Sequence, residues 1–270
     1  MCSKMVVQVS LVKLSSGYEM PMLGLGTYAR KADPGQFRQA VEWAIDAGYR
    51  HIDTASCYKN EEEIGEGIAN KIKQGVVNRQ DLFVTTKVKG EDTGIDHVET
   101  WRGMEEAVKL GLTRSIGVSN FNEEQLERLY KSANIKPVVN QFEINPTLTQ
   151  HKLVNFCKDH SIVPVAYTPL GLISEARPEF IGKDVIKTDP KLGELAQKYG
   201  KTQAQIALRY LIQRGIPALP KSFTKTRIEE NLNIFDFELT NTEMDIVDSY
   251  NIDHRCVPGT VFANCKNYPF

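Results

Sequence analysis

Apolar and polar positions follow two different patterns along the chain. Residues 7–12 alternate with a period of two and are followed by a turn at residues 15–18, which predicts a β-hairpin. From residue 22 onward, short apolar runs recur, and each is followed by a polar loop and a stretch with helical spacing. This pattern predicts alternating strands and helices over the rest of the chain.

The predicted strands cover residues 22–26, 49–53, 82–87, 115–118, 138–142, 163–167 and 216–220. The predicted helices include residues 37–47, 62–73, 98–110, 123–131, 152–159 and 202–213, and one that contains Glu230 and Asn231. Alternation without a linker predicts a parallel sheet within a single domain over residues 1–270. Such a sheet either stays open and doubly wound or closes into a barrel.

Polar residues follow the carboxyl ends of almost all the predicted strands. They are Thr27, Asp53, Lys87, Ser119, Asn120, Gln141, Glu143, Tyr167, Thr168, Lys221 and Ser222. An open sheet concentrates its functional residues near one crevice, whereas a barrel draws its active face from several strands. The distribution therefore favours an α/β fold of the TIM-barrel type. Seven strands are found, however, where a complete barrel has eight.

Composition excludes several classes of partner. The chain has 33 Lys and Arg against 34 Asp and Glu, which argues against nucleic acid or an anionic membrane as a partner. No apolar run approaches the ~18 residues of a membrane span. The five cysteines contain no C-x-x-C pair, which is typical of a reduced, cytoplasmic protein. The five histidines form no H-x-x-x-H pair, so no metal site is expected.

Two glycine motifs point to functions that their context does not support. Residues 24–29 fit a dinucleotide fingerprint, but the next helix begins only around Pro34, so a Rossmann site is not favoured. Residues 117–121 lack the second glycine of a nucleophile elbow, so a serine hydrolase is not favoured either.

The loop after the last strand has the composition of a phosphate site. Residues 220–227 combine hydroxyl groups with Lys221, Lys225 and Arg227 and lead into a helix. A helix N-terminus with nearby cations favours anions, and barrels commonly bind phosphate in the loop after the final strand. The alternative is a basic surface loop without a ligand.

Asp53, Tyr58 and Lys87 form the group with the clearest chemistry. Asp53 ends the second predicted strand, Tyr58 lies in the loop after it, and Lys87 ends the third. On a barrel these residues converge at one mouth, where a charged Lys87 is expected to lower the pKa of Tyr58. A tyrosine tuned in this way can donate a proton at neutral pH. The alternative is a structural Lys–Asp pair beside an unrelated tyrosine.

Several stretches resemble the aldo-keto reductase family, in the family's order along the chain. They are residues 48–55 (G-Y-R-H-I-D-T-A) with Glu61, Ile64 and Gly65, residues 116–121, Asn140 and Gln141, residues 167–171, and residues 219–222 with Arg227, Glu230 and Asn231. The resemblance implies a (β/α)8 barrel that reduces an aldehyde or ketone with NADPH. Its insect-type members resemble this chain most.

The resemblance also implies roles for individual residues. Tyr58 is the general acid, and Lys87 and Asp53 tune it. The implied cofactor-binding residues are Thr27, Tyr28, Asp53, Ser119, Asn120, Gln141, Tyr167, Thr168, Leu170, Lys221, Ser222, Thr224, Arg227, Glu230 and Asn231. Among them, Ser119, Asn120 and Gln141 resemble the contacts to the carboxamide, and Tyr167 the ring that stacks on the nicotinamide. Lys221, Ser222 and Arg227 resemble the residues that bind the 2′-phosphate, where cations suit the additional negative charge of NADP(H).

One unit of the family pattern is missing. The chain passes from Lys87 and Val88 to residues 98–101 without the family's fourth strand and its catalytic histidine, and His97 does not match that histidine. A seven-stranded closure is expected to be strained or to leave an open seam, because strand number, tilt and shear are linked. We expect the missing unit to reduce turnover more than cofactor binding.

Several alternatives remain open at this level. The chain is an altered product of a reductase gene, such as a splice form, or an active variant that closes its barrel differently. It could also be a non-catalytic NADPH-binding barrel, or a barrel hydrolase that uses Asp53 and Glu143. A small aldehyde and a steroid-like ketone are both possible substrates, bound by a cytoplasmic monomer whose pocket loop lies in residues 251–270.

Overall fold

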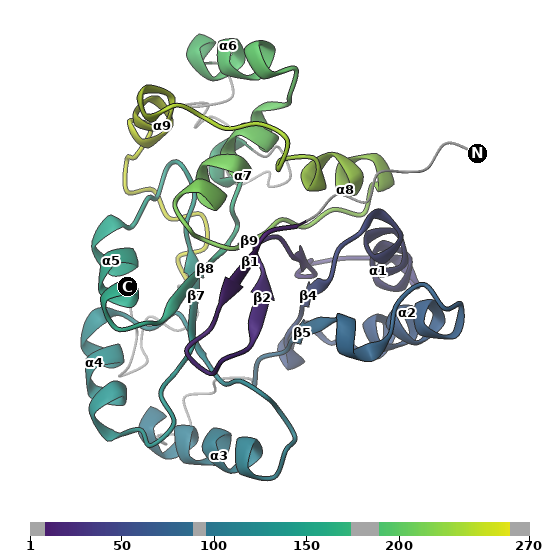
Figure 1. Ribbon diagram of the computed structural model, residues 1–270, viewed down its shortest axis with the longest axis vertical. Helices are drawn as coiled ribbons and strands as arrows, with labels where there is room; N and C mark the ends of the chain where they lie inside the picture. Colours follow the sequence, from purple (N-terminus) through teal and green to yellow (C-terminus); the bar gives the residue numbers. More distant parts are fainter. Residues whose placement is uncertain (1–8, 89–95, 174–188, 260–270) are drawn as a thin grey trace.

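A β-hairpin covers one end of the strands in this computed structural model, which describes residues 9–88, 96–173 and 189–259. Strand β1 (Leu11–Lys13) pairs antiparallel with β2 (Glu19–Pro21), and the turn between them has Gly17 at φ 89°. Leu14 and Met20 from the hairpin pack against Val138, Val163 and Leu219 of the main sheet. The predicted hairpin is confirmed, and it closes the end of the barrel opposite to the strands' carboxyl termini (Figure 1).

Seven short parallel strands make up the main sheet. They are β3 (Leu25–Gly26), β4 (His51–Asp53), β5 (Phe83–Thr85), β6 (Val118–Ser119), β7 (Val139–Glu143), β8 (Val163–Tyr167) and β9 (Ala218–Leu219). Hydrogen-bonded ladders give the orders β3-β4-β5 and β6-β7-β8-β9. Each strand falls within or next to its predicted range, although most are shorter than predicted.

The two parts of the sheet are joined where β9 meets the segment leading into β3. Ala218 N donates to Met22 O at 2.9 Å, and Gly24 N donates to Ala218 O at 3.0 Å. Gly26 N then donates to Pro220 O at 3.0 Å. The strands therefore run continuously from β5 through β3 and β9 to β6. Among the described residues no ladder joins β5 to β6, and we call this position the open seam.

Nine α-helices are described, and they lie around the outside of the strands (Figure 1). They are α1 (Gln36–Ala47), α2 (Glu61–Lys73), α3 (His97–Lys109), α4 (Glu123–Ser132), α5 (His151–Asp159), α6 (Pro190–Tyr199), α7 (Gln203–Gln213), α8 (Lys225–Leu232) and α9 (Asn241–Asp248). Short 3-10 turns η1 (Ser56–Tyr58), η2 (Arg79–Asp81) and η3 (Gly171–Ile173) lie between them. No helix of the described part is long and apolar enough to cross a bilayer.

Local sequence explains where several helices begin. Asn122, Thr202 and Thr240 each form a capping box with the residue three positions later, and Asp96 and Asp189 accept from backbone N–H groups of their helices. A capping side chain satisfies N–H groups that have no partner inside the helix. These caps fix the first residues of α3, α4, α6, α7 and α9.

The barrel interior is apolar except for a few polar groups with defined partners. His51 on β4 is buried, with Nδ1 3.3 Å from Pro21 O and Nε2 3.2 Å from Thr85 Oγ1. Burial lowers the pKa of His51 to about 4, because a charged imidazole would lose its hydration. A neutral ring can donate to Pro21 and accept from Thr85, so His51 links β4 to β5 without a buried charge.

The pKa of His51 predicts that the folded protein loses stability in mild acid. The unfolded chain takes up a proton near pH 6.5 and the folded chain near pH 4, so stability falls as the pH drops through this window, by roughly 3 kcal/mol. Urea unfolding between pH 7 and pH 4 measures the slope, and the variant His51→Gln should lack this share of it. An imidazole signal of His51 that titrates near pH 6.5 in the folded protein would contradict the prediction.

Gly26 allows the close approach of β3 to β9. A Cβ atom there would lie 2.7 Å from Leu219 O, a backbone atom that cannot move without disturbing the ladder. We expect Gly26→Ala to lower the free energy of unfolding by about 2 kcal/mol, measured in urea. Gly65 on α2 has no heavy atom within 4 Å of such a Cβ, so Gly65→Ala is the matched control and should stabilise by about 0.5–1 kcal/mol. Equal effects of the two substitutions would rule out this account of Gly26.

Candidate active site

A buried ion pair lies at the carboxyl ends of β4 and β5. Asp53 is 3 % exposed, and Lys87 Nζ donates to its Oδ1 at 2.8 Å and to its Oδ2 at 2.7 Å. Lys87 Nζ also donates to Thr54 O at 2.8 Å. An ammonium group has three N–H donors, and these three acceptors use all of them. The sequence-predicted convergence of Asp53 and Lys87 is therefore present.

The backbone of Lys87 fixes the turn that carries Tyr58. Ser56 N donates to Lys87 O at 3.0 Å, and Ser56 Oγ donates to the same oxygen at 3.1 Å. Ser56 begins η1, which ends at Tyr58. The tyrosine ring then lies 5.4 Å from Lys87 Nζ and 5.1 Å from the ring of Tyr28, which is 46 % exposed.

The prediction that the pKa of Tyr58 is lowered is wrong. Burial raises the pKa of Tyr58 above its usual value of 10, and the negative charge of Asp53 raises it further. Burial and Asp53 together outweigh the opposing effect of the Lys87 cation, which lies 5.4 Å from the centre of the ring. In this state Tyr58 keeps its proton throughout the physiological pH range.

Asn60 and Thr54 support this group together with the predicted Thr27, and neither side chain was assigned a function from the sequence. Thr27 Oγ1 donates to Asp53 O at 2.8 Å, and Asn60 Nδ2 donates to Thr27 O at 3.0 Å. Thr54 Oγ1 donates to Asn60 Oδ1 at 2.7 Å, and all three side chains are buried. Asn60 stands directly before the acidic start of α2, which is the one sequence signal that could have marked it as a helix-capping position.

A second polar group lies at the ends of β6, β7 and β8. Ser119 Oγ and Asn120 N both donate to Gln141 O at 2.9 Å, and Tyr167 OH donates to Asn120 Oδ1 at 2.9 Å. Asn120 has φ 58°, a left-handed conformation that asparagine tolerates better than most residues. Gln141 Nε2 donates to Asp53 Oδ1 at 2.8 Å, so the barrel interior connects this group to the ion pair.

Two predicted residues follow β8 and shape the next loop. Thr168 has φ 48°, and its carbonyl oxygen accepts from Gly171 N at 3.0 Å and from Asn145 Nδ2 at 3.3 Å. Leu170 packs against the hydrophobic core. These contacts give Thr168 and Leu170 a clear structural function in holding the loop.

The predicted phosphate loop is a third group, at the end of β9. Lys221 Nζ lies 4.4 Å from the ring of Phe223, and Thr224 N donates to Ser222 Oγ at 3.0 Å. Helix α8 begins after Thr224 without a side-chain cap. Arg227 and Glu230 are exposed, whereas Asn231, near the C-terminal end of α8, is buried. Cations and uncapped backbone N–H groups together suit an anion.

The region of the missing unit contains no additional strand among the described residues. After β5 the chain passes Lys87 and Val88, then residues 89–95 outside the described part, and enters α3 at His97. The His97 ring meets Phe121 edge-on at 5.2 Å, and its Nε2 is buried without a hydrogen-bond partner in the described part. Burial lowers the pKa of His97, which fits a neutral ring packed at the start of the helix.

The hydrolase alternative is not favoured by the surroundings of its two carboxylates. Asp53 is held by Lys87 and Gln141, and Glu143 accepts from the backbone N–H groups of Cys256 and Val257. A glycosidase needs carboxyl groups that face the substrate, one of them as a proton donor. Within the described residues, no group of three or more His, Cys, Asp or Glu side chains could hold a metal ion.

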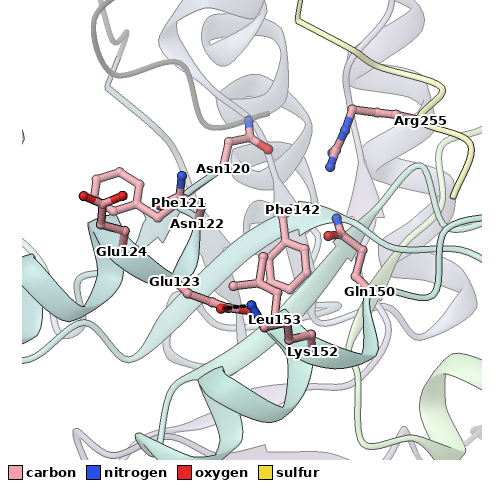
Figure 2. Close-up of a pocket in the computed structure, with 10 residues that line it drawn as sticks. All are labelled: Asn120, Phe121, Asn122, Glu123, Glu124, Phe142, Gln150, Lys152, Leu153 and Arg255. Atoms are coloured by element: carbon pink, nitrogen blue, oxygen red, sulfur yellow. Dashed lines mark ion pairs between the residues drawn. The ribbon is translucent and has the colours of Figure 1, made fainter.

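A cavity of about 360 Å³ opens beside the second polar group (Figure 2). Its lining includes Asn120 and Phe121 after β6, Phe142 of β7, and Gln150 before α5. Arg255 from the C-terminal segment points toward the space between Asn120 and Gln150 (Figure 2). At the outer edge Lys152 Nζ forms an ion pair with Glu123 at 2.7 Å. The cavity therefore joins a predicted cofactor-binding residue to the C-terminal segment.

Comparison with known proteins identifies one family. The model of the Aldo/keto reductase family matches residues 22–98 and 91–252, two segments that meet where the missing unit is expected. The chain is 41 % identical over 308 aligned positions to aldo-keto reductase AKR2E4 of Bombyx mori, covering 98 % of this chain and 100 % of that protein. It is 38 % identical to estradiol 17 beta-dehydrogenase 5 of Mus musculus, covering 96 % and 97 %. The aligned length of 308 exceeds the 270 residues of this chain, so these relatives have residues where it has none.

Solved structures give the same result for the fold. The crystal structure of Bombyx mori AKR2E4 in complex with NADP superimposes with a TM-score of 0.91 at 40 % identity, covering 98 % of this chain and 100 % of that one. The crystal structure of aldo-keto reductase AKR2E5 complexed with NADPH gives 0.93 at 39 % identity, covering 98 % and 94 %. The predicted barrel architecture is confirmed.

The buried ion pair predicts a strong coupling between its two charges. Removing the ammonium group leaves the buried carboxylate of Asp53 without its cation, so Lys87→Met should lower the free energy of unfolding by about 3 kcal/mol. The double variant Asp53→Asn with Lys87→Met should recover much of this loss, and urea unfolding of all four forms measures the coupling. Lys131→Met breaks an exposed pair with Glu127 and serves as the control, with stability expected to stay nearly unchanged. Additive losses in the cycle would contradict the coupling.

Proposed function

The chain belongs to the aldo/keto reductase family, and from this membership we propose that it reduces the carbonyl group of an aldehyde or ketone with NADPH. The observation that carries the proposal is the position of Tyr58 beside the buried Asp53–Lys87 pair, on the same face as Ser119, Asn120 and Gln141. Relatives solved with NADP and NADPH support the choice of cofactor.

Tyr58 supplies the proton in this proposal. Its raised pKa keeps the hydroxyl group protonated, so the proton is present when a carbonyl oxygen arrives. As the proton leaves, the Lys87 cation 5.4 Å from the ring stabilises the negative charge that develops on the phenolic oxygen. Asp53 and Thr54 hold Lys87 in this place.

The described residues fit a bound dinucleotide. Bound NADPH would supply the hydride that adds to the carbonyl carbon. A carboxamide side chain has two N–H donors and one acceptor, so the Gln141 bond to Asp53 leaves capacity to bind a nicotinamide carboxamide together with Ser119 and Asn120. The ring of Tyr167, whose hydroxyl group is bound by Asn120, would stack on the nicotinamide.

The loop after β9 would bind the other end of the cofactor. Lys221, Ser222 and Thr224 lie at the start of α8, and Arg227 is exposed on its first turn. Two cations at a helix N-terminus suit the 2′-phosphate that distinguishes NADPH from NADH. Thr27, Tyr28, Thr168, Leu170, Glu230 and Asn231 complete the proposed cofactor site.

The missing unit would affect turnover more than binding. Most of the proposed cofactor contacts lie on β6 to β9 and α8, and Thr27, Tyr28 and Asp53 lie at the ends of β3 and β4. All of them are outside the gap, whereas the family's catalytic histidine lies within it. Misplacement of a carbonyl by about 1 Å can cost roughly 10²-fold in rate. We therefore propose NADPH binding comparable to that of full-length relatives, with slower reduction of the carbonyl.

The substrate is proposed to be an apolar ketone, including steroid-like ketones. Relatives named as an estradiol dehydrogenase and a prostaglandin reductase support this class. In the structure, the half-exposed Tyr28 ring beside Tyr58 offers an apolar surface at the mouth of the barrel. Cys57, Cys157 and Cys256 form no disulfide among the described residues, which is consistent with the proposal of a monomeric protein in a reducing compartment.

Two measurements on the same samples test the proposal. Titration of NADPH fluorescence should show saturable binding, and NADPH oxidation with a panel of aldehydes and steroid-like ketones should show reduction. Tyr58→Phe should lower kcat/KM by about 10²- to 10⁴-fold and leave NADPH affinity within about twofold, because it removes only the proton donor. Tyr18→Phe in the hairpin is the control, since Tyr18 lies outside the candidate site.

Each other outcome selects a different function. A fully active Tyr58→Phe variant would remove Tyr58 as the proton donor. NADPH binding without reduction of any carbonyl would favour the non-catalytic NADPH-binding barrel. Absence of NADPH binding would overturn the proposed cofactor.

A further inference from the structure

The C-terminal segment Asn251 to Val257 is hydrogen-bonded to the connection between β7 and α5. Ile252 N and His254 N donate to Thr147 O at 3.3 and 3.0 Å, and Thr149 N donates to Asn251 Oδ1 at 3.0 Å. Thr147 and Thr149 are buried. The segment thus docks along one stretch of backbone that follows β7 directly.

Glu143 makes the strongest of these attachments. It is fully buried, with Oε1 accepting from Cys256 N at 2.7 Å and Oε2 accepting from Val257 N at 2.8 Å. Asn145 Nδ2 also donates to Oε1, at 3.3 Å. Hydrogen bonds to an ionised acceptor are shorter and stronger than neutral ones. Because both oxygens bind successive N–H groups, Glu143 fixes the direction of the segment as well as its position.

The strand that carries Glu143 also carries the proposed site. Glu143 ends β7 two residues after Gln141, and side chains two apart lie on the same face of a strand. Glu143 is the register partner of Tyr167 on β8, and Gln150 Nε2 donates to Glu143 O at 2.8 Å. The anchor is therefore rigid and is built on the same strands as Gln141 and Tyr167.

The anchored segment forms one wall of the cavity beside Asn120. Arg255 directly precedes the two residues that Glu143 binds, and its side chain enters the cavity that Asn120 and Phe142 also line (Figure 2). A shift of the Cys256 backbone would move Arg255 with it. The shape of this cavity consequently depends on a carboxylate that does not itself line it.

We propose that Glu143 is a positioning residue for carbonyl substrate binding, which it serves by fixing the C-terminal segment beside the site. This inference rests on the proposed function for its substrate. Glu143 takes no part in proton or hydride transfer. Its loss should weaken the binding of substrate, and leave NADPH affinity and the chemical step largely intact.

The variant Glu143→Gln tests this positioning. The amide keeps one acceptor oxygen but turns a donor toward the second backbone N–H, so one hydrogen bond is lost and the other is made to a neutral acceptor. We expect KM for a reduced ketone to rise about tenfold, with kcat and the NADPH dissociation constant within about twofold of wild type.

Glu105 provides a matched control. It is a buried glutamate on α3 that also accepts from two successive backbone N–H groups, Asn134 N at 2.7 Å and Ile135 N at 2.9 Å, and from the Asn134 side-chain amide at 3.1 Å. Glu105→Gln makes the same chemical change away from the proposed site. It should cost similar stability in urea and leave KM unchanged.

Limited trypsin digestion measures how often the C-terminal segment detaches, and it does not depend on enzyme activity. Cleavage after Arg255 requires the segment to detach, so Glu143→Gln should release fragments that begin at Cys256 at least about tenfold faster, and Glu105→Gln should not. If wild-type protein reduces no carbonyl, the proposed function fails, and the digestion still decides whether Glu143 anchors the segment. Unchanged cleavage in Glu143→Gln would overturn the anchor. Faster cleavage with an unchanged KM would overturn the link to substrate binding.

Discussion

The buried carboxylate of Asp53 is the group on which the arrangement of the site depends. A carboxylate that is 3 % exposed must be compensated by donors, and it receives them from Lys87 after β5 and from Gln141 on β7. These two strands lie in different parts of the sheet. Lys87, held in this way, presents its carbonyl oxygen to Ser56 and so determines where η1 places Tyr58. One charge thus sets the positions of the proposed proton donor and of a proposed nicotinamide contact.

The open seam explains why such a link across the interior matters. A closed barrel holds its strands in place through ladders on both sides of each strand. In the described residues, β5 has a ladder only with β4, and its three residues are half-buried where those of β4 are fully buried. Among the described residues, hydrogen-bonded strands connect the two parts of the sheet through β3 and β9. The Gln141–Asp53 bond is a short connection between the parts that the missing strand would otherwise have joined.

The sequence predicts what local pattern controls, and fails where distant groups meet. Short apolar runs located the seven parallel strands of the described residues, and β8 matches its predicted range, because a strand that is buried on both faces is a continuous apolar run. The contacts from Gln141 to Asp53 and from Glu143 to Cys256 span 88 and 113 residues, and no local pattern encodes them. The pKa of Tyr58 was predicted in the wrong direction, since it is raised mainly by burial of the hydroxyl group and then by the charge of Asp53, and local sequence does not encode that burial. Glu143 was read as a possible acid because a carboxylate at a strand end has the same sequence signal whatever binds it.

The residues proposed to bind the cofactor and those proposed to supply the proton belong largely to different parts of the sheet. Most contacts proposed for the cofactor lie on α8 and on β6 to β9, which ladders join into one part of the sheet. Tyr58 and Lys87 belong with β3 to β5, and so do the proposed cofactor residues Thr27, Tyr28 and Asp53. Hydride transfer and proton transfer must reach the two atoms of one carbonyl group, so they require the two parts of the sheet to be aligned within about 1 Å. Binding of a dinucleotide depends mainly on one of those parts, the one formed by β6 to β9 and α8. A barrel that lacks one strand can therefore keep its affinity for a cofactor, while the rate of its reaction depends on how well the β9–β3 ladder and the Asp53–Gln141 bond hold the two parts together.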